Sequence, residues 1–332
     1  MSASIPEHPF AEFIKILGKG KKGARALTED EAYRAMRMIL AGETLPIQLG
    51  AFLMLMRIKE ETSAELIGFT RAAKERIETP RPLPAADLDW SSYAGKRRHL
   101  PWFILSGLLL AANGVKVFMH GAGGHTGGRI YTENVLQTLG LPRADNLAAA
   151  GALLETHNFS YLSLEYLCRP LYDIINLRPV MGLRSPVHTL VRLLNPLDAP
   201  YSLQGIFHPS YRQVHQLAAQ GLKQPHMAVL KGEGGETERN PDVECLVQSV
   251  HFGELSDEIW PPLFNRRHLK AETLDPAQLR QLWRGLWHDE YAAAAVIGTA
   301  AIAIQLLGRA AGIAEAERLA AQWWEERDKQ RF

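Results

Sequence analysis

Two short apolar runs, each followed closely by a cluster of glycines, most constrain the fold of this chain. Val115–Met119 precedes Gly121-Ala-Gly-Gly124 and a helical pattern that begins at Thr132. Met227–Leu230 precedes Gly232-Glu-Gly-Gly235. A strand, a glycine turn and a helix in succession are typical of a parallel α/β sheet. We therefore expect an α/β domain built on a central, mostly parallel sheet.

The first 75 residues have the spacing of helices instead. Phe10, Phe13 and Leu17 recur at helical intervals, and Thr28 followed by Glu31 forms a capping-box pattern. Prolines at 80, 82 and 84 then make a stiff link. We expect a small helical domain over residues 1–79, to which the arginine-rich residues 161–194, with their helical pattern, return. The α/β domain is expected over residues 80–160 and 195–332.

Composition limits the class of protein. Two cysteines, Cys168 and Cys245, make a disulfide framework unexpected and supply no metal-ligand spacing. The apolar run Phe103–Ala112 is too short to span a bilayer, and Ala292–Leu307 is interrupted by polar residues and glycine, so both predict buried helices. Prolines at 6 and 9 argue against a secretory signal. The sequence predicts a soluble, cytoplasmic protein without a membrane partner.

A basic, glycine-rich loop lies between two of the expected helices. No acidic residue occurs between Glu12 and Glu29, whereas glycines occupy positions 18, 20 and 23. Because the formal net charge of the whole chain is only +1, the charge is local. Such a loop favours binding of a polyanion, although a solvated loop that only confers solubility explains it equally. Its basic residues are Lys15, Lys19, Lys21, Lys22 and Arg25.

A second glycine-rich segment follows the strand expected at 115–119. It reads His120-Gly-Ala-Gly-Gly-His-Thr-Gly-Gly128. Backbone N–H groups in such a turn, at the start of a helix, can bind phosphate. The spacing is neither that of a dinucleotide-binding turn nor that of a P-loop. A tight turn that needs positive φ angles is the alternative interpretation.

These features together resemble the anthranilate phosphoribosyltransferase family over most of the chain, up to about residue 250. The helical signature of that family resembles Gln48–Arg57, and its "L-G-x-R-T" and "T-N-P" segments resemble Met181–Arg184 and Asn195-Pro196. Leu136–Gly140 follows the glycine turn, as in the family. The resemblance implies the family's fold, a homodimer formed through the helical domain, and an active site between the domains.

The chain departs from the family at the substrate motifs. The "G-T-G-G-D" loop that holds phosphoribosyl pyrophosphate falls on Tyr93–Arg97, "N-x-S-T" on His99–Pro101, and "K-H-G-N-R-S" on Met119–Gly124. The family's metal-binding "D-E" pair falls near Glu236 and Glu238, which are weak candidates for a metal site. No catalytic residue, metal or cofactor is assigned, and magnesium would be needed only by an active enzyme. The expected vestigial cleft comprises Gly95, His120, Gly121, Gly123, Gly124 and Arg178, the last at the position of the family's anthranilate-binding arginine.

A subgroup of anthranilate phosphoribosyltransferase-like proteins that bind nucleic acid without enzyme activity resembles the chain more closely. Its "G-x-G-K-x-x-A-R" loop resembles Gly18–Arg25, and its "R-I-K" resembles Arg57–Lys59. Its "G-x-R-x-x-x-H-T-L" and "H-P-x-Y" segments resemble Gly182–Leu190 and His208–Tyr211. The resemblance implies binding of nucleic acid rather than phosphoribosyl transfer.

The leading hypothesis is therefore a non-enzymatic homodimer that binds DNA or RNA without sequence preference. Besides the basic loop, a second patch is expected to contribute Lys96, Arg97, Arg98, Arg184 and Arg192. The alternative is an active phosphoribosyltransferase that uses phosphoribosyl pyrophosphate and magnesium, with anthranilate or another acceptor. A third hypothesis is a scaffold or sensor that binds small phosphates in the cleft.

Overall fold

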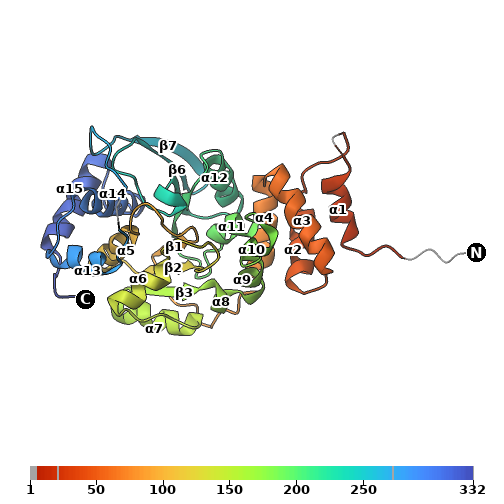
Figure 1. The fold of residues 1–332 in the computed structure, drawn as a ribbon, viewed down its shortest axis with the longest axis horizontal. Helices are drawn as coiled ribbons and strands as arrows, with labels where there is room; N and C mark the ends of the chain where they lie inside the picture. Colours follow the sequence, from red (N-terminus) through yellow and green to blue (C-terminus); the bar gives the residue numbers. More distant parts are fainter. Residues whose placement is uncertain (1–5, 21, 271–272, 332) are drawn as a thin grey trace, which may run out of the picture.

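The computed structural model describes residues 6–20, 22–270 and 273–331. Figure 1 shows helices α1 to α4 grouped at one end of the molecule and a helix-covered sheet at the other. The four helices are α1 (Ala11–Gly18), α2 (Glu29–Leu40), α3 (Pro46–Lys59) and α4 (Ser63–Lys74). They confirm the helical pattern of the first 75 residues.

Local sequence signals determine where these helices begin. Thr28 accepts a hydrogen bond from the N–H of Glu31, whose carboxylate accepts one from the N–H of Thr28, so the predicted capping box is confirmed. Thr62 and Glu65 form a second capping box at α4. Pro46 occupies the first turn of α3, where a missing N–H costs nothing.

The second domain contains a seven-stranded sheet. Its strands are β1 (Leu88–Ser92), β2 (Val117–Gly121), β3 (Phe159–Ser163), β4 (Tyr201–Ile206), β5 (His226–Lys231), β6 (Cys245–His251) and β7 (Glu254–Trp260). They lie in the order β3-β2-β1-β4-β5-β6-β7. The first five strands in this order pair in parallel, β6 pairs antiparallel with β5, and β7 pairs antiparallel with β6. The predicted α/β class with a mostly parallel sheet is confirmed.

Two details differ from the sequence prediction. The second glycine cluster leads into the short 3₁₀ turn η2 (Glu233–Gly235) and then into the hairpin β6–β7, not into a helix. The φ angles of Gly234 and Gly235 are +69° and +89°, so these residues cannot begin a right-handed α-helix, which requires negative φ angles. Residues 159–163, expected to be partly helical, form strand β3 because they pair in parallel with β2.

Short helices follow β3 and lie between the sheet and the four-helix group (Figure 1). They are α8 (Leu164–Leu167), α9 (Arg169–Ile175), α10 (Arg178–Met181), α11 (Val187–Leu190) and the 3₁₀ turn η1 (Val191–Leu193). The other helices are α5 (Phe103–Ala112), α6 (Thr132–Leu139), α7 (Leu147–His157), α12 (Tyr211–Gly221), α13 (Ala277–Arg284), α14 (Glu290–Leu306) and α15 (Ile313–Glu326).

Alternate strand residues supply two hydrophobic clusters, one on each face of the sheet. In β2, Val117 and Met119 join the cluster that contains α5, α14 and α15, whereas Phe118 joins the opposite cluster. That opposite cluster also contains the buried side chains of α1 to α4. A single hydrophobic core therefore runs from the helical domain to one face of the sheet.

Helices α4 and α12 approach closely within this shared core. A Cβ atom on Gly221 would lie 2.3 Å from Cδ1 of Ile67. Among the described residues no helix is long and apolar enough to cross a membrane. The apolar run Ala292–Leu307 belongs to α14, which is mostly buried.

Candidate functional site

The carboxyl ends of the parallel strands carry the loops expected to form the site. Ser92 of β1, Gly121 of β2 and Ile206 of β4 end at this edge of the sheet. Ligands of open α/β sheets bind outside the carboxyl ends of the strands. The loops after these strands are therefore the first place to look for a functional site.

The loop after β1 is the segment predicted to correspond to the family's pyrophosphate loop. The N–H groups of Ala94 and Gly95 both donate to Oε1 of Glu236, at 2.8 and 2.5 Å. The carbonyls of the same two residues accept from Nη1 of Arg129, at 2.9 and 2.8 Å. Gly95 has a φ of +67°, and a Cβ there would lie 2.8 Å from the ring of Tyr131. The backbone polar groups of this loop are thus occupied by the protein's own side chains.

Lys96 follows in this loop and is completely buried, which contradicts its prediction as a surface contact for nucleic acid. Its ammonium forms ion pairs with Glu233 and with Glu238, the latter at 2.6 Å. Although burial lowers the pKa of Lys96, these two carboxylates raise it above its usual value. Burial raises the pKa of Glu238 to about 7, against the opposing effect of Lys96. One ammonium therefore neutralises much of the charge of two buried carboxylates.

The residues present do not fit a magnesium site. The two weak candidates are already engaged: Glu236 by the amides of the loop, and Glu238 by Lys96 and the N–H of Phe103 at 2.9 Å. In the part of the chain that the structure describes, no group of three His, Cys, Asp or Glu side chains could hold a metal ion. Of these two carboxylates, only Oε2 of Glu236 has no hydrogen-bond partner among the described residues, and one buried oxygen does not supply the several oxygen ligands that magnesium takes.

The histidine-glycine segment after Met119 is largely structural. His120 is buried, with Nδ1 2.7 Å from the hydroxyl of Tyr93 and Nε2 3.2 Å from Oδ1 of Asp89. A Cβ on Gly121 would lie 2.1 Å from the carbonyl oxygen of Ser92, so glycine is required for strand packing. A Cβ on Gly123 would contact Glu133 at 3.0 Å, whereas Gly124, with a φ of +81°, faces open space.

Beside this segment the structure gathers four arginines: Arg129, Arg178, Arg184 and Arg192. Nη1 of Arg178 donates to the carbonyl of His125 at 3.3 Å. Burial, and then the charges of the other three arginines, lower the pKa of Arg184 to about 10. The lowered pKa reflects repulsion between like charges that lie close together, so the cluster is a concentration of positive charge.

Arg192 is buried, contrary to its prediction as a surface contact for nucleic acid. Its Nε donates to the carbonyl of Gly205 at 2.9 Å, and its Nη1 donates to the carbonyl of His188. With Arg184 and His188 it borders a cavity of about 80 Å³. Sequence reasoning missed Arg57, from α3, and His188 as lining residues, although Arg184, His188 and Arg192 recur at helical spacing.

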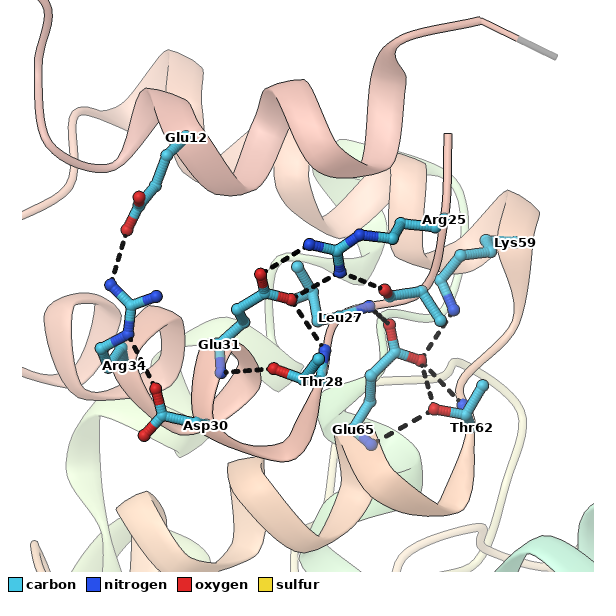
Figure 2. A network of polar contacts seen from close by, with 11 residues as sticks. Glu12, Arg25, Leu27, Thr28, Asp30, Glu31, Arg34, Lys59, Thr62 and Glu65 are labelled. Carbon is cyan, nitrogen blue, oxygen red and sulfur yellow. Dashed lines mark hydrogen bonds and ion pairs between the residues drawn. The ribbon is translucent and has the colours of Figure 1, made fainter. Parts of the chain in front are cut away.

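The basic loop lies beside the last turn of α3, and several of its charges are paired. Arg25 donates to both carboxylate oxygens of Glu31, at 2.6 and 2.7 Å, as Figure 2 shows. Lys15 forms an ion pair with Glu7 at 2.5 Å. Lys19 and Lys22 are exposed and have no ion pair among the described residues. Lys21 lies outside the described residues.

A buried carboxylate connects this loop to α3 and α4. Glu65 accepts hydrogen bonds from the N–H of Leu27 at 2.8 Å and from Nζ of Lys59 at 2.7 Å (Figure 2). A groove of about 680 Å³ lies beside the loop and is bordered by Arg25 and Lys59. Because Arg57 borders the 80 Å³ cavity, the last turn of α3 separates the groove from the cavity.

Arg97 and Arg98 are the remaining members of the predicted second patch. Both are exposed, and neither has an ion pair within the described residues. Of the five residues predicted for this patch, these two lie at the surface, Arg184 is half-buried, and Lys96 and Arg192 are in the interior. The structure thus divides the second patch between surface and core.

Known proteins share this architecture. The family described as "Glycosyl transferase family, helical bundle domain" matches residues 11–77. The anthranilate phosphoribosyltransferase structure from Thermus thermophilus has a TM-score of 0.77 and 24% identity, covering 94% of each chain. The Saccharomyces cerevisiae enzyme "in complex with PRPP and Mg" has a TM-score of 0.75 and 15% identity, covering 96% of this chain and 97% of that chain.

Sequence relatives extend the comparison. The uncharacterized protein YbiB of Escherichia coli is 30% identical over 61% of this chain and 64% of its own length. An uncharacterized protein of Aquifex aeolicus is 32% identical over 71% of this chain and 72% of its own length. The anthranilate phosphoribosyltransferase of Methylocella silvestris is 28% identical over 92% of this chain and 89% of its own length.

These matches first define the class of fold, a glycosyl transferase helical bundle joined to an α/β domain. The chain thus contains the helical bundle domain of this glycosyl transferase family and is similar over most of its length to proteins named anthranilate phosphoribosyltransferase.

Proposed function

We propose that the protein is a non-catalytic member of this family that binds the phosphate backbone of nucleic acid. One observation carries the proposal: the amides of Ala94 and Gly95, in the loop that resembles the family's pyrophosphate loop, are bound by Glu236. Transfer of a phosphoribosyl group requires donors aimed at the charge that develops on pyrophosphate. Donors already bound to a carboxylate do not serve this purpose.

The basic surface supports nucleic acid as the ligand. Lys19 and Lys22, on a glycine-rich loop, and Arg97 and Arg98 are exposed cations without an acidic partner in the described part of the chain. Arg25 is paired with Glu31, but water screens an ion pair at the surface, so a phosphate can compete with Glu31 for this arginine. Cations that contact phosphates give affinity without reading bases, so no sequence preference is expected.

We further propose a homodimer formed through α3. Ile47, Ala51, Met54 and Ile58 recur at helical spacing, and Ile47 and Ile58 are 79% and 77% exposed. A Cβ on Gly50, beside this stripe, would meet nothing within 4 Å, so a second helix can approach closely. A second copy is the occupant we favour because an isologous contact lets the same stripe cover itself.

A salt series with labelled single-stranded and duplex DNA tests the binding proposal. The logarithm of the wild-type affinity should fall linearly with the logarithm of the salt concentration. Changing Lys19 and Lys22 to Ala should weaken binding and reduce the slope by about 0.7 to 0.9 for each phosphate that the variant no longer neutralises. The control replaces Arg143 and Arg318, which are exposed on other elements, with Ala. A wild-type protein that does not bind at low salt contradicts the proposal.

The family relationship favours phosphoribosyl transfer as the second candidate, since relatives named anthranilate phosphoribosyltransferase match most of the chain. Its test is release of pyrophosphate from phosphoribosyl pyrophosphate in the presence of magnesium and anthranilate. We expect none above the uncatalysed rate. Turnover that is lost when Lys96 is changed to Met would establish the enzyme and overturn the non-catalytic proposal.

A further inference from the structure

The small cavity near α11 has the properties of an anion-binding site. It lies between the last turn of α3, the segment that contains α11 and η1, and the start of α12, and its volume is about 80 Å³. A single water needs only about 10–15 Å³ of such space, so a small anion fits. The lining includes Arg57, Arg184, Thr189 and His188.

His188 presents a ring nitrogen without a partner there, among the described residues. The residue is only 5% exposed, and its Nδ1 lies 3.2 Å from both the backbone nitrogen and the carbonyl oxygen of Ser185. Burial, and then the charges of His125 and Arg184, hold the pKa of His188 well below its usual value, so the ring is neutral. When Nδ1 accepts from the N–H of Ser185, the proton is on Nε2, and an anion in the cavity favours this tautomer because Nε2 can then donate to it. This buried Nε2 has no hydrogen-bond partner among the described residues.

The two arginines that border the cavity are also available. Within the described residues neither Arg57 nor Arg184 has a hydrogen bond or ion pair to another protein group. Two carboxylates in this region have hydrogen-bond partners of their own: Glu61 accepts from the hydroxyl of Tyr211 at 2.5 Å, and Glu236 from the loop amides. The charge of Arg57 also acts on Glu61, where it opposes the rise in pKa that burial causes. The buried charge of Arg192 adds to the positive potential.

We propose that this cavity binds a phosphate monoester, the terminal phosphate of either a nucleotide or a nucleic-acid strand. Two guanidinium groups match a dianion in charge, and donors from α3 and from the segment that contains α11 can surround a tetrahedral group better than a planar carboxylate. The small volume admits a terminal group rather than a continuous backbone. The site goes beyond the proposed backbone binding and needs neither Lys19 nor Lys22.

Binding of inorganic phosphate and of a nucleoside 5′-monophosphate to the full chain, measured by calorimetry, tests the site. Arg184→Gln should weaken binding about tenfold or more, as expected for loss of a charge-assisted hydrogen bond. His188→Gln should also weaken it. Arg318→Gln, on the distant helix α15, is the control and should bind as the wild type. Wild-type protein without phosphate binding, or an unchanged Arg184→Gln variant, overturns the proposal.

The source of the phosphate is distinguished with two oligonucleotides that differ only in a 5′-phosphate. A preference for the phosphorylated strand that disappears in Arg184→Gln identifies a strand end as the ligand. Equal binding of both strands, with Arg184-dependent binding of the monophosphate, identifies a free nucleotide. If Arg184→Gln does not fold, Arg57→Gln, which approaches from the helical domain, replaces it. The Lys19 and Lys22 double variant should keep its affinity for phosphate, which separates this proposal from backbone binding.

Discussion

At the residue scale, Glu236 acts as an internal anion. Its carboxylate is held by the amides of Ala94 and Gly95, while Arg129 binds the carbonyls of the same loop. Burial raises the pKa of Glu236, although the amide of Gly95 and the charge of Arg192 oppose this effect. Two amides that point to one oxygen form the kind of concave site that binds anions in other proteins.

Removing this carboxylate should make the loop responsive to added anions. In Glu236→Ala the two amides lose their acceptor, which should lower the free energy of unfolding by about 1–3 kcal/mol. Pyrophosphate should then raise the melting temperature of the variant but not of the wild type, as measured by differential scanning fluorimetry. Glu254→Ala, at the exposed hairpin of β7, is the control. Equal responses to pyrophosphate in all three proteins would show that Glu236 does not occupy an anion site.

His215 provides a pH test of the buried core near the cavity. It is 1% exposed, its Nδ1 lies 2.8 Å from Oε1 of Gln204, and burial together with Arg192 lowers its pKa from 6.5 to about 3. Above pH 6.5 the ring is neutral in both states, so its stabilising contribution is complete there. Between pH 6.5 and about 3 only the unfolded chain takes up the proton, and that contribution is lost.

Wild-type stability should therefore fall on acidification more steeply than that of His215→Gln. One proton corresponds to a difference in slope of about 1.4 kcal/mol per pH unit. Urea unfolding at a series of pH values measures it. His157→Gln, at the exposed end of α7, should follow the wild type. Parallel curves for wild type and His215→Gln would contradict a neutral buried ring.

At the element scale, the sequence predicted most of the helices because their signals are local. The capping pair Thr28 and Glu31, and Pro46 at the start of α3, act within one helical turn. The site was less predictable because its partners are distant in sequence. Lys96 meets Glu238 across 142 residues, so the charge pattern around residue 96 gave no sign that this lysine is buried. The strand at 159–163 was missed because its pairing with β2 is also non-local.

Substitutions on the exposed face of helix α3 test the proposed homodimer. Ile47→Glu or Ile58→Glu places a charge within the exposed apolar stripe and should convert a dimer to a monomer, measured by light scattering. Because both side chains are exposed in the single chain, the monomer's stability should change by only about 0.5 kcal/mol or less. Leu269→Glu, at a site 92% exposed elsewhere, should leave the mass unchanged. A monomeric wild type would contradict the proposed homodimer.

At the scale of the whole molecule, the sheet separates two hydrophobic clusters, and one of them contains the four N-terminal helices. Phe69 of α4 is completely buried in that cluster, with its ring 6.1 Å from that of Phe52. Lys74 of the same helix forms an ion pair with Asp198, which precedes β4. The stability of the helical domain should therefore be coupled to that of the α/β domain.

All seven tryptophans lie after residue 80, so tryptophan fluorescence reports unfolding of the α/β domain. A substitution in the helical domain that shifts the fluorescence transition therefore measures the coupling. Phe69→Ala should lower the free energy of unfolding by about 3–5 kcal/mol, as buried aromatic truncations do. The fluorescence transition should move to lower urea together with the helical signal from circular dichroism. Val180→Ala, at a side chain 84% exposed, is the control. A fluorescence transition that stays in place in Phe69→Ala would show that the two domains unfold independently.

The close approach of α4 and α12 also limits how this chain can be divided. A side chain on Gly221, the last residue of α12, would displace the terminal methyl group of Ile67, so the face of α4 around Ile67 fits closely against α12. A fragment of the chain limited to residues 1–79 would expose that apolar face to water, which would promote aggregation. The helical bundle, although recognisable on its own as a family signature, is therefore not an interchangeable module, and transplanting it onto another scaffold would require a new surface for α4.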